Sequence, residues 1–168
     1  MLSASVAAIL ARDLRTLRRE IEAYPEERQV WQAVEGIPNT GGTLALHLAG
    51  NIRHFVGARL GASGYVRDRA AEFARRDVPR AELLREIGEA ERVLGALARL
   101  DDAALAAEFP EPIGGCRMAT GDLLVHLVAH LDYHLGQLDY HRRAVTGRPE
   151  GVGAMATREL ATARPAGG

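Results

Sequence analysis

Apolar residues recur at three- and four-residue spacing in four long stretches, and this feature constrains the fold of the chain more than any other. Such spacing places apolar side chains on one face of an α-helix. It predicts helices over residues 3–23, from Thr40 to about Leu60, from Pro79 to about Leu97 and from Thr120 to about Val145. Long helices that share an apolar core form a bundle, so we expect an all-α fold, a four-helix bundle.

Residues with strong preferences for helix ends flank these stretches. Ser3 or Ser5 is expected to cap the first helix and Thr40 the second, because a side-chain oxygen can accept a hydrogen bond from a free backbone N–H group. Pro79 suits the first turn of the third helix, and Asp122 favours the N-terminus of the fourth. The predicted helix boundaries are therefore supported by local chemistry.

The connections between the predicted helices are uneven. Segments 61–78 and 101–119 are long, and loops of this length in a compact domain are more often functional than idle. We expect one domain over residues 1–146 and a C-terminal tail over 147–168, with a short helix near Met155–Leu160.

The charged residues exclude several classes of function. The 21 basic residues are all arginine, the acidic residues number 22, and the net charge is −1. Without lysine there is no Schiff-base nucleophile and no Walker-type phosphate site, and balanced charge lacks the basic field that nucleic-acid binding uses. The single cysteine cannot form an intramolecular disulfide. Arg12 and Asp13 interrupt the N-terminal apolar stretch, so we expect a soluble, cytoplasmic protein that binds neither nucleic acid nor membrane.

Histidine is the residue type that most suggests chemistry here. The six histidines fall in two predicted helices, the second with His47 and His54 and the fourth with His126, His130, His134 and His141. An i, i+4 pair places two imidazoles on one helix face, about 6 Å apart along the axis, near enough to share a metal ion. The pairs 126/130 and 130/134 both have this spacing.

Helical angles separate these two pairs. With Leu127 at zero and about 100° per residue, His134 falls at about −20°, His130 at about −60° and His126 at about −100°. His130 and His134 thus border the apolar stripe, whereas His126 lies toward solvent. His141 is about 10 Å further along the axis than His134, too far for the same ion. We therefore favour His130 and His134 as a metal-binding pair.

A third ligand must come from another helix, and spacing alone leaves its identity open. His47 and His54 both flank the apolar stripe of the second helix at similar angles. Three neutral imidazoles suit Zn, Ni, Fe or Co and leave coordination positions for water or substrate. The alternative is that these are hydrogen-bonded or surface histidines of an ordinary bundle.

Three separated blocks of sequence resemble the DinB-like superfamily of four-helix-bundle metalloproteins. They are HLAGNIRHFVGARLG, GYVRDRAAEF and HLVAHLDYHLGQLDYHRR, and the likeness covers residues 38 to 146. The subgroup with an HLxGN second helix and a YHxGQ fourth helix is the most similar. In such families one histidine of the second helix and an HxxxH pair of the fourth hold a divalent metal, and the resemblance assigns these roles to His47, His130 and His134.

The resemblance also implies an activity. Relatives include transferases and isomerases that use low-molecular-weight thiols such as mycothiol or bacillithiol, with the metal thought to activate the thiol. The expected function is therefore that of a metal-dependent transferase acting on a small-molecule substrate with a small thiol as cosubstrate. The alternatives are a metal-dependent hydrolase and a non-catalytic bundle that binds a metal or ligand. Alanine-rich helices could also pack against a second copy as a homodimer.

Other side chains are candidates for binding substrate. Asn51 follows His47 by one turn and could orient a ligand or instead hydrogen-bond a neighbouring helix or loop; Gln137 could act similarly or face solvent. Arg67 and Arg69 could bind a carboxylate or phosphate, or could fix segment 61–78 to the bundle through salt bridges. Cys116 precedes the fourth helix, but no base is evident beside it, so an inert thiol is the favoured interpretation.

Overall fold

Six α-helices make up most of the computed structural model, which describes residues 2–166. Within this range there is no β-strand, only three isolated bridges in turns. The α-helices are α1 (Leu2–Glu22), α2 (Gly41–Ile52), α3 (Arg69–Ala74), α4 (Arg80–Val93), α5 (Asp102–Ala106) and α6 (Thr120–Thr146). Short 3-10 helices cover Glu27–Trp31, Leu94–Arg99 and Thr157–Glu159.

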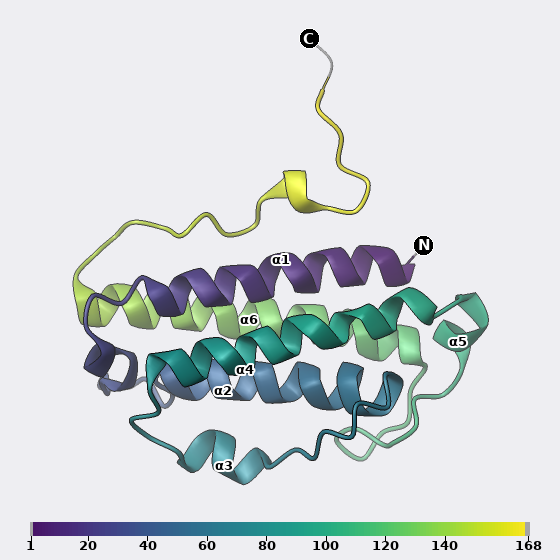
Figure 1. Cartoon of the computed structure of the whole chain (residues 1–168), viewed down its shortest axis with the longest axis horizontal. Helices are drawn as coiled ribbons and strands as arrows, with labels where there is room; N and C mark the ends of the chain where they lie inside the picture. The colour runs from purple at the N-terminus through teal and green to yellow at the C-terminus, as the bar shows by residue number, and fades with distance from the viewer. Residues whose placement is uncertain (1, 167–168) are drawn as a thin grey trace.

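The four long helices form the predicted bundle. α1 contacts α4 and α6, and α2 contacts the same two helices, so the four helices close a ring around one core. Figure 1 shows them lying side by side along the long axis of the molecule. All four contribute buried leucine or isoleucine side chains from the apolar stripes: Leu10, Leu14, Leu17, Ile21, Leu44, Leu48, Ile52, Leu83, Ile87, Leu124, Leu127, Leu131 and Leu138.

The helix ends agree with the sequence in part. The Thr40 side chain accepts a hydrogen bond from the Thr43 amide, which confirms it as the cap of α2. The cap predicted at Ser3 or Ser5 is wrong, because α1 already begins at Leu2. Ser3 lies inside the helix and donates instead to the carbonyl of Leu100.

The end of the second predicted helix differs from the expected α-helix. From Arg53 to Leu60 the chain continues as a π-helix, with wider turns than the α-helix before it. The prediction of one helix from Thr40 to Leu60 was right in its length but wrong in the geometry of its second half. Segments of π-helix are rare and frequently occur at functional sites.

Both long connections contain a short helix that apolar spacing does not reveal. In segment 61–78, α3 is capped by Asp68, which accepts from the Ala71 amide, and it contacts α2. In segment 101–119, α5 is capped by Asp101, which accepts from the Ala104 amide. Figure 1 shows α3 against the outer side of α2, so this connection is part of the wall beside α2 and not a free loop.

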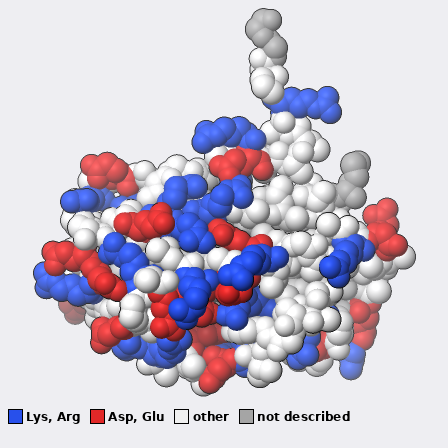
Figure 2. Space-filling model, in the orientation of Figure 1, with Lys and Arg blue, Asp and Glu red and all other residues white. Residues whose placement is uncertain are grey.

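Arginine contacts hold the C-terminal tail against the bundle. Arg15 forms an ion pair with Glu159, and Arg19 donates to the carbonyl of Val152. The 3-10 turn at Thr157–Glu159 falls within the short helix predicted near Met155–Leu160. Basic and acidic side chains are interspersed over the face drawn in Figure 2. No helix among residues 2–166 is long and apolar enough to cross a membrane.

Candidate metal centre

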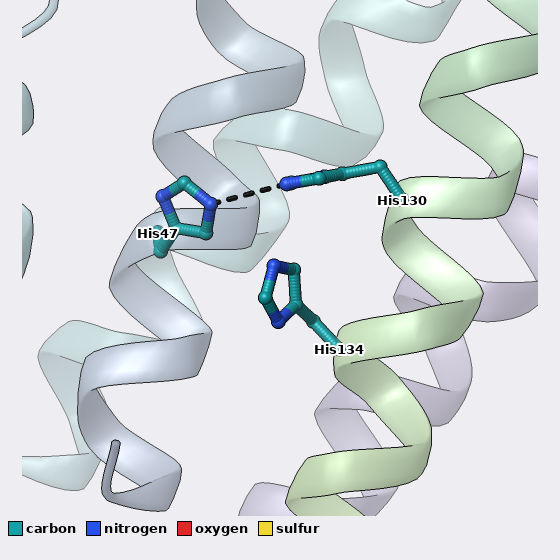
Figure 3. A group of neighbouring side chains, drawn as sticks. All are labelled: His47, His130 and His134. Carbon is teal, nitrogen blue, oxygen red and sulfur yellow. Dashed lines mark hydrogen bonds between the residues drawn. The ribbon is translucent and has the colours of Figure 1, made fainter. Parts of the chain in front are cut away.

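Three imidazoles from two helices converge between α2 and α6. His47 comes from α2, and His130 and His134 come from successive turns of α6. Their ligand atoms all lie within 4.8 Å of one another, and the Nε2 atoms of His47 and His130 are 3.2 Å apart. Figure 3 shows the three rings directed at one another across the gap between the helices. The spacing that favoured His130 and His134 therefore corresponds to a real cluster with His47.

A buried carboxylate holds His47 in place. Glu72 of α3 is 6% exposed, and its Oε2 lies 3.0 Å from His47 Nδ1. Arg67 donates to both carboxylate oxygens of Glu72, at 2.7 and 2.8 Å. Burial acts to raise the pKa of Glu72, but the hydrogen bonds from Arg67 and His47 outweigh it and hold this pKa below its usual value. Ionised Glu72 can only accept, so the His47 proton resides on Nδ1 and the Nε2 lone pair faces the cluster.

Gly50 makes this arrangement sterically feasible. A Cβ atom built on Gly50 would lie 2.1 Å from Glu72 Oε1, far inside van der Waals contact. Glycine at this position lets the Glu72 side chain lie directly against α2 and reach His47. The glycine of the HLxGN pattern thus has a steric reason in this chain.

The two cluster histidines of α6, His130 and His134, have lowered pKa values, and His134 is oriented by a hydrogen bond. His134 Nδ1 donates to Gln137 Oε1 at 2.8 Å, which leaves its Nε2 lone pair for the cluster. Burial, and next the neighbouring imidazoles, lower the pKa of His130 to about 4. Burial also lowers the pKa of His134, although the bond to Gln137 opposes the shift. Neutral imidazoles are the form that binds a metal ion, so no proton needs to be displaced near pH 7.

The geometry of the cluster fits a divalent metal with nitrogen ligands. Zinc binds imidazole nitrogen at about 2.0–2.1 Å, so two ligands of a tetrahedral site are roughly 3.3 Å apart. The 3.2 Å separation of the His47 and His130 nitrogens matches this edge, and the ligand atoms of all three residues lie within a wider 4.8 Å of one another. Each outer ring nitrogen of His47 and His134 is held by an acceptor side chain, as is usual for metal-binding histidines. The donor set is compatible with Zn, Ni, Fe or Co and does not distinguish them.

A cavity of about 580 Å³ opens beside the cluster. The three histidines form one part of its wall, and segments 61–78 and 101–119 supply much of the rest. Its lining includes Asn51, Phe55, Arg67, Arg69, Phe73, Glu111, Ile113, Leu123, His126 and Leu127. Three of the four candidate substrate-binding residues, Asn51, Arg67 and Arg69, thus lie at this cavity. Gln137 is not among its lining residues and contacts His134 instead.

The remaining three histidines lie outside the cluster. His54 extends from the π-helical segment and bonds Glu111 at 2.7 Å. His126 is exposed, with its ring centre 6.1 Å from that of His130. His141 is buried between the Tyr24 hydroxyl and the Gln32 carbonyl, at 2.8 Å from each.

Sequence reasoning did not assign roles to Glu72 and Phe73 at this site. Glu72 orients His47, and the Phe73 ring packs 4.8 Å from the His47 ring, centre to centre. Both residues lie in α3, which apolar spacing did not detect. The nearest available signal was Gly50, because a glycine inside a buried helix indicates close approach of another group. Cys116 is exposed in a turn and is not among the cavity-lining residues.

The fold and the site together define an all-helical bundle protein with a three-histidine candidate metal centre. The sequence model of the DinB superfamily matches residues 9–138, so the chain belongs to this superfamily, which is associated with metal binding. Searches of curated proteins and of solved structures found no match. The subgroup with the HLxGN and YHxGQ patterns remains a prediction from the sequence.

Proposed function

We propose that His47, His130 and His134 hold a divalent metal ion and that the protein is a metal-dependent transferase using a small thiol. The observation that carries the proposal is the convergence of three imidazoles whose ligand atoms lie within 4.8 Å of one another at the wall of a cavity. Three protein ligands leave at least one coordination position for a substrate atom.

The chain's own residues prepare this position. Glu72 and Gln137 each hold one ring nitrogen, so that His47 and His134 present their Nε2 atoms to the same point. A divalent metal bound there would lower the pKa of a thiol enough to supply a thiolate at neutral pH. The thiolate sulfur would bond to an electrophilic carbon of the second substrate, the leaving group would depart with its electron pair, and the thiol proton would pass to solvent.

The carboxylates at the cavity favour thiol transfer over hydrolysis. A metal-dependent hydrolase commonly uses a free carboxylate to take a proton from water. Glu72 is engaged by Arg67 and His47, and Glu111 is engaged by His54 and Arg59. Glu111 lines the cavity and Glu72 bonds His47, and both carboxylates are already engaged, so neither is free to act as a base. A thiolate needs no such base.

Metal binding is the first test of the proposal. Protein purified without a histidine tag and treated with chelator would be titrated with Zn(II) and Ni(II) by calorimetry. We expect one ion per chain in the wild type and a loss of at least 100-fold in affinity in His47→Ala. His126→Ala is the matched control, because His126 borders the same cavity outside the cluster. Equal affinity in His47→Ala and His126→Ala would contradict the proposed ligand set.

Thiol transfer is the second test. The metal-loaded protein would be given a panel of small thiols with 1-chloro-2,4-dinitrobenzene, and release of chloride and formation of the thioether would be followed. The wild type and His126→Ala should accelerate the reaction, whereas His130→Ala should not. Equal rates in the wild type and His130→Ala would refute a metal-dependent transferase and leave a binding role. Homodimer formation and cytoplasmic location stay predictions from the sequence.

A further inference from the structure

The charges around the cavity are almost entirely paired. Glu72 is neutralised by Arg67, and Glu111 by Arg59 together with its bond to His54. Arg69 is an exposed residue at the rim of the cavity, and its side chain forms no ion pair or hydrogen bond with any residue that the structure describes. The cavity therefore carries one positive side chain, Arg69, that no carboxylate of the described residues neutralises.

Phe73 holds the Arg69 side chain at the cavity. Arg69 begins α3, and its guanidinium carbon lies 5.1 Å from the centre of the Phe73 ring one turn later. A guanidinium over a ring does not use its N–H groups for the contact, so they are available to a ligand. A planar guanidinium with free N–H groups matches the two oxygens of a carboxylate.

A second polar group in the cavity also lacks a partner. Asn51 is 6% exposed, and its Oδ1 atom is buried with no hydrogen bond to the described residues. Buried polar atoms are nearly always hydrogen-bonded, and the oxygen and nitrogen of an amide exchange places by a half-turn of the side chain. Turned toward the cavity, Oδ1 would accept from an N–H or O–H group of a bound molecule. The rings of Phe55 and Phe73 supply apolar surface to the same cavity.

We infer that the cavity binds a small carboxylate whose negative group pairs with Arg69, whose hydrogen-bond donor reaches Asn51 and whose apolar part contacts Phe55 and Phe73. This inference assigns a substrate class to the cavity of the proposed function. It rests on the proposed function only in treating the carboxylate as a substrate of the transfer reaction. Binding of the carboxylate itself needs no metal ion.

Matched ligands test the charge requirement. N-acetylleucine carries a carboxylate, an amide N–H and an apolar side chain, and N-acetylleucinamide is its neutral counterpart. In calorimetric titrations of chelator-treated protein, we expect the carboxylate to bind at least tenfold more tightly than the amide. Arg69→Gln should abolish this preference, and Arg158→Gln, an equal charge change on the exposed tail, should preserve it. A preference that persists in Arg69→Gln, or one that is absent from the wild type, would overturn the inference.

The role of Asn51 is tested with an analogue of N-acetylleucine in which an ester oxygen replaces the amide N–H and the carboxylate is kept. The wild type should bind this ester about tenfold more weakly than the amide-containing acid, whereas Asn51→Leu should not distinguish them. If both proteins distinguished the ester from the amide-containing acid equally, Asn51 would not be the group that binds the amide N–H. Inorganic phosphate binding more tightly than N-acetylleucine in an Arg69-dependent manner would overturn the assignment of a carboxylate.

Zn(II) titrations keep the two proposals separable. Arg69→Gln should bind Zn(II) as the wild type does, because Arg69 is outside the three-histidine group and forms no hydrogen bond with it among the described residues. Loss of the carboxylate preference with normal Zn(II) binding would refute only the substrate class. Absence of Zn(II) binding with an intact, Arg69-dependent preference would refute the proposed function and leave the carboxylate site.

Discussion

Replacing Gly50 by alanine tests whether the support of His47 by Glu72 matters for metal binding. The new Cβ atom would lie 2.1 Å from Glu72 Oε1, and ordinary contact begins at 3.4 Å. The carboxylate must therefore move by about 1.3 Å, which is enough to break its 3.0 Å hydrogen bond to His47. Loss of such a supporting partner costs 10- to 100-fold in metal affinity, about 1.4–2.7 kcal/mol.

The same type of substitution elsewhere in the bundle supplies the control. Gly136 lies in α6, and a Cβ built on it meets no atom within 4 Å. Gly136→Ala should stabilise the protein by about 0.8–1 kcal/mol through helix propensity and leave Zn(II) affinity unchanged. In urea unfolding, Gly50→Ala should show a smaller increase in unfolding free energy than Gly136→Ala. In calorimetry, it should bind Zn(II) 10- to 100-fold more weakly than the wild type. If the two variants behaved alike in both measurements, the steric and positioning argument for Gly50 would be refuted.

Three further changes test other parts of the structure. Glu72→Gln removes the charge that orients His47, and we expect Zn(II) affinity to fall about 10- to 100-fold in calorimetry while the circular dichroism spectrum stays the same; unchanged affinity would contradict its role. The pKa of His130 is lowered to about 4 from 6.5, chiefly by burial. As the pH falls, His130 therefore becomes protonated in the unfolded chain at a higher pH than in the folded chain. Between pH 6.5 and pH 4, the metal-free protein should lose up to about 1.4 kcal/mol of unfolding free energy for each pH unit. Urea titrations should show a smaller loss in His130→Gln. Parallel pH profiles of the two proteins would refute the lowered pKa of His130. Arg142→Ala leaves the buried Glu20 carboxylate without the guanidinium 2.5 Å away, and thermal and urea unfolding should show a loss of about 3–5 kcal/mol, so a loss below 1 kcal/mol would contradict the importance of this pair.

The fold was largely predictable because helix formation follows local spacing. The stripe with Leu44, Leu48 and Ile52 predicted the core face of α2, although every residue of α2 is buried, and the leucines of α6 predicted its core face in the same way. The short helices α3 and α5 were missed, since six and five residues carry too little periodicity to register. The π-helical turns after Ile52 were missed as well, because apolar spacing over eight residues does not distinguish them from α-helical turns.

The candidate site was predictable in the part that lies on one helix. His130 and His134 are an i, i+4 pair, and helical geometry alone brings their rings together, with centres 4.6 Å apart. The third histidine required more information, because His47 and His54 both border the apolar stripe. Resemblance to the DinB-like families favoured His47, and the structure brings His47 to the pair while His54 bonds Glu111.

The sequence by itself determined the four helices, their core faces and the pairing of His130 with His134, because each of these depends on residues a few positions apart. Only the tertiary structure decided which groups meet across the bundle. It brought Glu72 to His47 over the bare surface of Gly50, paired Arg67 with Glu72 and left Arg69 free at the cavity. These contacts join residues on different helices and in the segment before α3, and their distances follow from packing, which no local pattern encodes.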